Sequence, residues 1–183
     1  MNSSTNNNPI FIDFEASSLS FISYPIEIAW GNSINKIQSF LISPKNVSGW
    51  NDWSIQSQFV HGIDRGILFS KGIDPNIIAH KITNELVNMK VYSDNPDYDA
   101  MWMKTLFDAT EIDYPDIDLL HLDSLLIETI CPDSFNRIEH LPKLIEIKMK
   151  ARKIVNYQHR AKYDVWYLIE TWNLSKIYRK SLL

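Results

Sequence analysis

The chain has 183 residues, of which 45% are hydrophobic, 22% charged and 12% aromatic, the proportions of an ordinary globular domain. A chain of this length buries roughly two-thirds of its unfolded surface, so a core can form without disulfides or a structural metal. Its one cysteine excludes an internal disulfide and makes the reducing cytoplasm the expected location. The first residues do not resemble a signal peptide, and no apolar run approaches the roughly 18 residues that span a membrane. We therefore expect neither secretion nor membrane insertion.

Charge is unevenly distributed along the chain, although the formal net charge is only -4. Residues 137–180 contain 11 Lys and Arg against 4 Asp and Glu, whereas the residues before them contain 7 basic and 18 acidic side chains. This asymmetry suits an acidic metal site that phosphates approach over a basic surface. The alternative is that the basic run is only the solvated face of a helix.

The N-terminal part of the chain predicts a leader and then three strands. Residues 1–8 are small and polar, so we expect a disordered leader before a single domain over residues 9–183. Residues 10–14 form a nearly continuous apolar run, the pattern of a central strand covered on both faces. Two further β-prone runs, 24–30 and 34–42, are joined by Gly-Asn-Ser and predict a hairpin.

Helices and strands alternate after a long connection. The irregular Gly and Pro spacing of residues 44–74 predicts a connection that contains short helices. Apolar residues in steps of three and four then predict a helix over 75–89, with Asp74 as its N-cap. The remaining elements that we expect are strands 90–93 and 118–122 and helices 97–107, 123–130, 141–154 and 161–172. This order predicts an α/β fold with a mixed five-stranded sheet flanked by helices.

Two carboxylates lie on the first predicted strand, where a buried face is expected. Alternation along a strand places Asp13 and Glu15 on one face, with their Cα atoms about 6.5 Å apart. Both side chains would then converge on one or two cations. The alternative is that the strand ends at Asp13 and that both acids reach solvent.

Two later acids also lie at places that favour a site. Asp164 borders the apolar stripe of the last predicted helix, and burial would require a metal or a basic partner. Asp99 follows the strand over 90–93, where α/β sheets commonly bind ligands, although acids also initiate helices. His159 precedes Asp164 by five residues, so the two converge only if His159 lies in the loop before the helix.

Three motifs in chain order resemble the DEDDh group of 3′-to-5′ exonucleases, and the resemblance covers nearly the whole chain. They are Asp13-Phe14-Glu15, Asn95-Pro96-Asp97-Tyr98-Asp99 and His159-Arg160-Ala161-Lys162-Tyr163-Asp164. Val60-His61-Gly62-Ile63 is similar to a short segment often found in this group. The chain departs from the pattern at Ser17-Ser18, where many relatives have Thr or Gly, and in the extra acids Asp94 and Asp97.

The resemblance implies a ribonuclease H-like fold and hydrolysis of single-stranded RNA or DNA from the 3′ end to nucleoside 5′-monophosphates. Two Mg²⁺ or Mn²⁺ ions would neutralise the charge of the reacting phosphodiester, and hard carboxylate oxygens select such ions. By resemblance, Asp13 bridges both ions, Glu15 and Asp164 complete one site, and Asp99 holds the other. His159 would deprotonate the attacking water.

Substrate contacts follow from the same resemblance. The residues that it implies at the 3′ end are Phe14, Ser17, Leu19, His61, Ile63 and Tyr98. On residue type alone, we expect Trp50 and Trp53 to serve ordinary core packing, with stacking on the bases of a single strand as the alternative. Basic residues that would attract the strand are Lys150, Arg152, Lys153 and Arg160.

Two other functions stay open at the level of sequence. One is a noncatalytic nucleic-acid-binding module that kept the fold. The other is a phosphodiesterase for short oligonucleotides or dinucleotides, because the metal motifs alone do not set substrate length. A homodimer is a further expectation, since many proteins that the chain resembles dimerise.

Overall fold

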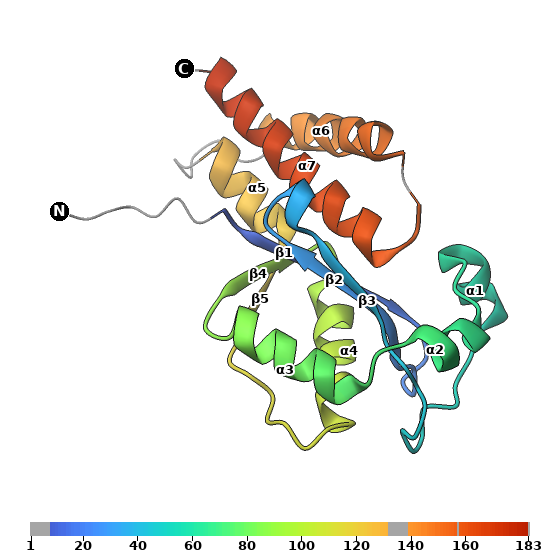
Figure 1. Cartoon of the computed structure of the whole chain (residues 1–183). Coiled ribbons are helices and arrows are strands. Elements are labelled where there is room, and N and C mark those ends of the chain that lie inside the picture. Colours follow the sequence, from blue (N-terminus) through green and yellow to red (C-terminus); the bar gives the residue numbers. More distant parts are fainter. Residues whose placement is uncertain (1–7, 132–138, 157, 183) are drawn as a thin grey trace.

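Five strands form one mixed sheet in the part of the chain that the computed structural model describes, which is residues 8–131, 139–156 and 158–182. The strands are β1 (Ile10–Ala16), β2 (Pro25–Gly31), β3 (Gln38–Leu41), β4 (Lys90–Ser93) and β5 (Asp118–His121). Their order is β3-β2-β1-β4-β5, antiparallel among β1, β2 and β3 and parallel among β1, β4 and β5 (Figure 1). The predicted α/β fold and the central position of the first strand are confirmed. The expected leader lies outside the described residues except for Asn8.

Helices cover both faces of the sheet. They are α1 (Ile55–His61), α2 (Arg65–Lys71), α3 (Pro75–Leu86), α4 (Pro96–Asp108), α5 (Leu122–Ile130), α6 (Leu141–Val155) and α7 (Ala161–Ser181). Helices α3 and α4 pack on one face, and α5, α6 and α7 pack on the other (Figure 1). No helix among the described residues is long and apolar enough to cross a membrane.

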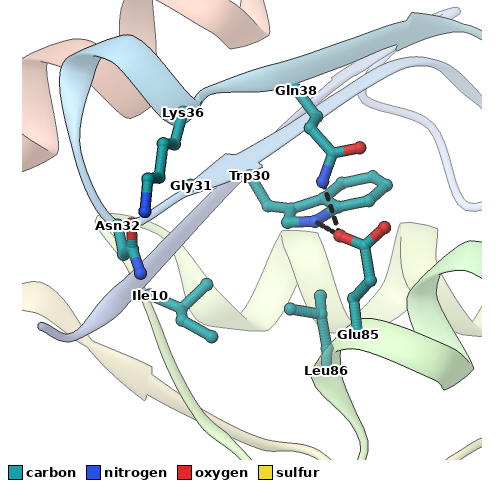
Figure 2. A pocket seen from close by; sticks show the side chains of 8 residues that line it. All are labelled: Ile10, Trp30, Gly31, Asn32, Lys36, Gln38, Glu85 and Leu86. Carbon is teal, nitrogen blue, oxygen red and sulfur yellow. Dashed lines mark hydrogen bonds between the residues drawn. The ribbon is translucent and has the colours of Figure 1, made fainter. Parts of the chain in front are cut away.

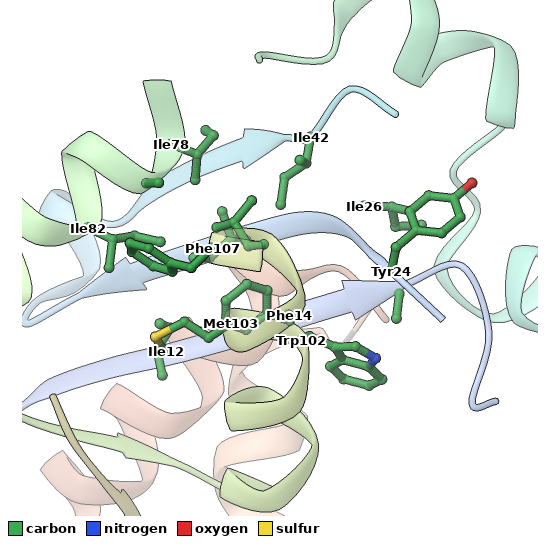
Figure 3. Packing of buried hydrophobic residues seen from close by; sticks show 14 of the residues in the cluster. Ile12, Phe14, Tyr24, Ile26, Ile42, Ile78, Ile82, Trp102, Met103 and Phe107 are labelled. Carbon is green, nitrogen blue, oxygen red and sulfur yellow. The ribbon is translucent and has the colours of Figure 1, made fainter. Parts of the chain in front are cut away.

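The apolar pattern of β1 divides the core into two layers. Ile12 and Phe14 point toward α3 and α4, where they pack against Trp102 and Met103 (Figure 3). Phe11 points the other way and contacts the ring of Trp172 on α7, with ring centroids 6.1 Å apart. Because successive side chains of a strand alternate, Asp13 and Glu15 share the face of Phe11, which α7 covers.

The start of α3 follows the predicted capping chemistry. The Asp74 carboxylate accepts a hydrogen bond from the N–H of Asn76 at 2.8 Å, and Pro75 occupies the first turn. The helix ends at Leu86, three residues earlier than predicted. Asn88 is the reason, because its φ of +59° is left-handed and ends the helical run.

The predicted strand over 34–42 is wrong in its first half. Residues 34–36 form a 3-10 turn, η1 (Ile34–Lys36), and β3 begins only at Gln38. The N–H of Lys36 donates to the Ser33 carbonyl at 2.9 Å, so the chain folds back over Gly31. A Cβ at Gly31 would lie only 3.0 Å from the Ile37 Cα, which explains the glycine.

Two elements are longer than predicted. Strand β1 continues two residues beyond residue 14, so Asp13 and Glu15 both lie within the strand and the alternative of a strand that ends at Asp13 is wrong. Helix α7 continues nine residues beyond Trp172. Leu174 and Tyr178 in this extension pack with the core between α6 and α7, and tertiary contacts of this kind extend a helix beyond its periodic sequence signal.

The long connection over 44–74 contains α1 and α2, as predicted, and returns to the sheet at Gly72. Ile73 exchanges backbone hydrogen bonds with the end of β3, donating to the Leu41 carbonyl at 2.8 Å. A Cβ at Gly72 would lie 2.4 Å from the Leu68 carbonyl oxygen and 2.7 Å from the Ser43 nitrogen. Only glycine therefore allows this close approach of two backbones.

We expect Gly72→Ala to lower the free energy of unfolding by about 1–3 kcal/mol, the usual cost of overpacking. The added methyl group would push the end of α2 away from the chain after β3. Urea denaturation followed by circular dichroism measures this, with Ser70→Ala on the exposed side of α2 as the control. Equal stability of Gly72→Ala and wild type would contradict this account of the close approach.

Candidate metal centre

Three carboxylates converge between β1 and α7. Oxygen atoms of Asp13, Glu15 and Asp164 all lie within 4.8 Å of one another. Asp13 and Glu15 come from the centre of the sheet, and Asp164 lies in the first turn of α7, where it is 7% exposed. The structure thus brings together three of the four acids that the sequence singles out. Carboxylate oxygens this close can share a hard divalent cation.

Asp99 lies beside this group, in the first turn of α4. Its side chain is 2% exposed and accepts a hydrogen bond from the Ser93 hydroxyl at the end of β4. Burial raises the pKa of this carboxylate, and the nearby backbone of Phe14 acts in the opposite direction. Asp99 is therefore fixed between β4 and β1, close enough for its charge to act on Asp13 and Glu15.

Burial and mutual repulsion raise the pKa values of these acids. Burial is the largest cause at Glu15, followed by the charge of Asp164, and the pKa rises to about 8. Burial also raises the pKa of Asp99 to about 8, and it raises the pKa of Asp13 well above its usual value. Such acids hold protons at neutral pH unless a cation replaces them, so the donor set fits Mg²⁺ or Mn²⁺.

A buried ion pair fixes the start of α7 against the sheet. Glu27 of β2 is 2% exposed and lies opposite Glu15 in the strand pairing. Its carboxylate accepts hydrogen bonds from Arg160 Nε at 2.8 Å and Nη2 at 2.7 Å, and from the Ala161 N–H at 3.1 Å. Ser39 of β3 donates a fourth at 3.1 Å. This network places Asp164, one turn later, over Asp13 and Glu15.

Glu27 is a site residue that the sequence reasoning missed. The signal was present, because Glu27 is an acid inside the apolar run of β2, as Asp13 is in β1. The guanidinium of Arg160 is paired with Glu27 in two hydrogen bonds, and its expected attraction for the nucleic-acid backbone stays a prediction. Arg160 also lowers the pKa of Glu15 in opposition to burial.

His159 lies in the exposed loop immediately before α7, whose N-cap is Arg160. This confirms the loop position that convergence with Asp164 requires. Among the described residues, neither ring nitrogen of His159 belongs to the group of possible metal-ligand atoms formed by Asp13, Glu15 and Asp164. Its role as a general base therefore stays a prediction.

The residues expected at the substrate fall into exposed and buried sets. Leu19 and Tyr98 are exposed, 72% and 37% respectively, beside the ends of β1 and β4. Ser17 is fully buried, and the side chains of Phe14 and Ile63 lie in the core. Contact of the buried residues with a nucleotide stays a prediction.

His61 is the last residue of α1 and is 4% exposed. Its Nδ1 accepts the Ile63 N–H at 3.0 Å, so the neutral ring carries its proton on Nε2, which is buried without a hydrogen-bond partner among the residues that the structure describes. Burial, followed by the charge of Arg160, lowers the pKa of His61 to about 4. His61 therefore presents a neutral, unused hydrogen-bond donor near Arg160 and Glu27.

The two tryptophans of the long connection serve packing. Trp50 is buried and stacks on Tyr24, with ring centroids 5.1 Å apart and an interplanar angle of 9°. Trp53 packs against the core and donates from Nε1 to Gln58 at 2.8 Å. Base stacking on Trp50 is therefore excluded, and ordinary packing is the correct reading.

A pocket of about 200 Å³ lies at the other end of the sheet, where β1 begins. Its acid, Glu85 of α3, accepts hydrogen bonds from Trp30 at 2.9 Å and from Gln38 (Figure 2). The Glu85 carboxylate is thus already used in joining α3 to β2 and β3. The converging acids at the other end are the better candidate for a metal.

We expect metal-free protein to lose stability as the pH rises from about 4.5 to about 8. The folded state raises the pKa of Glu15 and Asp99, so it binds protons that the unfolded chain has released, and stability falls with pH across this window. Melting temperatures in EDTA at both ends of the window measure this effect. Added Mn²⁺ should restore stability mainly at the upper end, whereas equal restoration at both would contradict a carboxylate site.

We expect Glu27→Gln to weaken Mn²⁺ binding and to lower the free energy of unfolding by about 1–3 kcal/mol, because a hydrogen-bonded charge pair is lost. Isothermal titration calorimetry and urea denaturation measure the two effects. Ser39→Ala is the matched control, since it removes one hydrogen bond to the same carboxylate and leaves α7 attached. Unchanged Mn²⁺ affinity in Glu27→Gln would show that Asp164 is held by other contacts.

The fold is similar to that of solved protein structures, although the sequence has no match among families or curated proteins. No protein-family model matches the sequence, and no curated protein sequence matches it. Solved structures do match. E. coli Exonuclease I in complex with a dT13 oligonucleotide has a TM-score of 0.58 at 16% identity, over 94% of this chain and 42% of that chain. The zinc-bound form of the E. coli ExoI–ssDNA complex has a TM-score of 0.60 at 16% identity, over 94% and 41%.

A product-bound structure of exonuclease I gives a TM-score of 0.58 at 16% identity, over 96% of this chain and 45% of that chain. The chain thus spans less than half the length of these proteins. Over nearly all of its own length it has the ribonuclease H-like α/β fold that they contain.

Proposed function

We propose that the protein is a metal-dependent 3′-to-5′ exonuclease of the DEDDh type that acts on single-stranded nucleic acid. The observation that carries the proposal is the convergence of Asp13, Glu15 and Asp164, with Asp99 buried beside them. Four acids gathered on β1 and on the first turns of α4 and α7 are costly to bury without cations. The fold shared with structures of exonuclease I bound to oligonucleotides supports the choice of substrate.

In this proposal the acids hold two Mg²⁺ or Mn²⁺ ions, which neutralise charge on the attacked phosphodiester. Asp13 would serve both ions, Glu15 and Asp164 would help to hold one, and Asp99 would help to hold the other. The hydroxyl of Ser93 keeps Asp99 oriented through its hydrogen bond. The exposed loop position of His159 would let its imidazole take a proton from the attacking water.

The substrate enters at the exposed side of the acids. Leu19 and Tyr98 lie at this side and would contact the terminal nucleotide. The buried Nε2–H of His61 is a donor that a nucleotide oxygen can use. The backbone of Phe14 and the residues Ser17 and Ile63 would support the same nucleotide.

A homodimer stays a prediction, which sedimentation of the purified protein tests.

The test is incubation of the protein with 5′-labelled single-stranded RNA and DNA in Mg²⁺, Mn²⁺ or EDTA. We expect a metal-dependent ladder that shortens from the 3′ end. Asp13→Asn should abolish it, and His159→Ala should lower kcat by about 10²- to 10⁴-fold, the usual contribution of a general base. Asp108→Asn, on the exposed end of α4, is the matched control and should keep full activity.

The outcomes also separate the alternatives. Strand binding without cleavage by folded protein would favour a noncatalytic binding module and would refute the exonuclease. Cleavage of dinucleotides that is much faster than cleavage of longer strands would favour the phosphodiesterase for short substrates. Equal activity in EDTA would exclude the metal mechanism.

A further inference from the structure

The segment that leaves β1 combines serines that are held in place with large apolar side chains that are exposed. We call residues 17–23, Ser-Ser-Leu-Ser-Phe-Ile-Ser, the serine loop. We propose that Asp52 is a positioning residue that fixes the serine loop, so that Phe21 contacts a nucleobase of the bound strand. The identity of the occupant rests on the proposed function, whereas the role of Asp52 rests on its own contacts.

Asp52 gathers three hydroxyl groups of the serine loop on one carboxylate oxygen. Its Oδ2 accepts hydrogen bonds from Ser20 at 3.1 Å, from Ser17 at 3.4 Å and from Ser18. Ser18 also accepts the Ser20 N–H at 3.0 Å. A carboxylate that accepts several hydroxyl donors is a strong organiser, because hydrogen bonds to a charged acceptor exceed neutral ones. Asp52 comes from the long connection before α1, so a distant part of the sequence shapes the loop.

Both ends of the serine loop are also anchored. The N–H of Tyr24 donates to Ser17 Oγ at 3.1 Å, and the N–H of Ser54 donates to the Ser17 carbonyl at 2.9 Å. At the other end, Trp102 of α4 donates from Nε1 to Ser23 Oγ at 3.0 Å. Within the loop, the Ser23 N–H donates to the Ser20 carbonyl at 3.1 Å. From outside the loop, Asp52 holds the middle part, which carries Leu19 and Phe21.

This middle part exposes large apolar side chains. Leu19 is 72% exposed, Phe21 100% and Ile22 71%. Three such side chains within four residues would collapse onto the nearby core if the loop were free, because burial of each is favourable. An exposed apolar cluster of this kind marks a binding surface.

A pocket of about 240 Å³ lies between the serine loop and the first turns of α4. Its lining residues are Leu19, Ser20, Phe21, Asp97, Tyr98 and Met101. Tyr98 and Asp99 are successive residues in the first turn of α4, so the pocket lies at the same end of α4 as Asp99. It is largely apolar and contains two aromatic rings, which suits a flat base.

The charge of this pocket favours a nucleobase of the bound strand over its phosphate backbone. Asp97 is the charged residue of its lining, and a carboxylate repels a phosphate. An uncharged nucleobase avoids this repulsion and gains stacking on Phe21 or Tyr98. The pocket thus takes a base of the strand whose phosphodiester lies at the acids.

The test measures strand binding and cleavage in Asp52→Ala, Asp52→Asn, Phe21→Ala and the double variant Asp52→Ala/Phe21→Ala. We expect Asp52→Ala and Phe21→Ala each to raise KM and the Kd for a labelled single strand by roughly 5- to 150-fold, the effect of losing one stacked base. The effects should not add in the double variant, because Asp52 acts through the loop. Asp52→Asn should keep most of the affinity, since its amide oxygen still accepts hydroxyl donors.

Three controls separate positioning from a general structural role. Mn²⁺ affinity and kcat should stay close to wild type in all four variants, and the melting temperature should fall only in the two variants with Asp52→Ala, in which the serine hydroxyls lose their acceptor. Ile77→Ala, an exposed apolar residue on α3, should bind the strand as wild type does. A set of strands would each carry one abasic site at a different position among the last few nucleotides. Wild type should bind one of these strands more weakly than the others, whereas Phe21→Ala should bind all of them with similar affinity.

Each outcome bears on a different claim. If wild type cleaves strands and either Phe21→Ala or Asp52→Ala binds the single strand with wild-type affinity, this inference is overturned and the proposed exonuclease function is unaffected. Additive effects in the double variant, or a matching loss of Mn²⁺ affinity, would overturn the positioning role. Wild type that neither binds nor cleaves strands would refute both the proposed function and the occupant of the pocket.

Discussion

The mutual repulsion of buried carboxylates is the constraint on which the rest of this site depends. Asp13, Glu15 and Asp164 have oxygen atoms within 4.8 Å of one another, and Asp99 is buried beside them. Burial and repulsion raise the pKa values of Asp13, Glu15 and Asp99, so the bare site is electrostatically unfavourable. Only a rigid framework keeps such groups together when no cation binds, because a flexible one would let them separate.

The framework is supplied by the sheet and by one ion pair. Strand β1 lies at the centre of the sheet, where pairing with β2 and β4 fixes the direction of its side chains. Glu27 then attaches α7 to β2 through Arg160 and the Ala161 N–H. Glu27, on the strand paired with β1, therefore neutralises Arg160 beside the site. It also holds α7, the helix that carries Asp164. The same logic recurs at Asp52, whose carboxylate organises a loop rather than a helix.

Much of this arrangement was predictable because it depends on local patterns. Alternation in β1 separated Asp13 from Ile12 and Phe14, and helical spacing placed Asp164 beside a buried stripe. The errors have physical causes that no local pattern contains. Residues 34–36 form a 3-10 turn because the chain folds back over Gly31. Helix α7 continues past Trp172 because α6 packs against the extension.

The sequence by itself determined the order of the elements, the central strand and the candidate acids, since these follow from periodicity and residue type. The tertiary structure decided which charges meet. It paired Arg160 with Glu27, which are 133 residues apart, and it set Asp52 against serines more than 30 residues away. It also buried Trp50 in a stack with Tyr24, which removes Trp50 from any role in stacking on nucleobases. Partners this distant are joined only when the chain folds, so no spacing along the sequence indicates them.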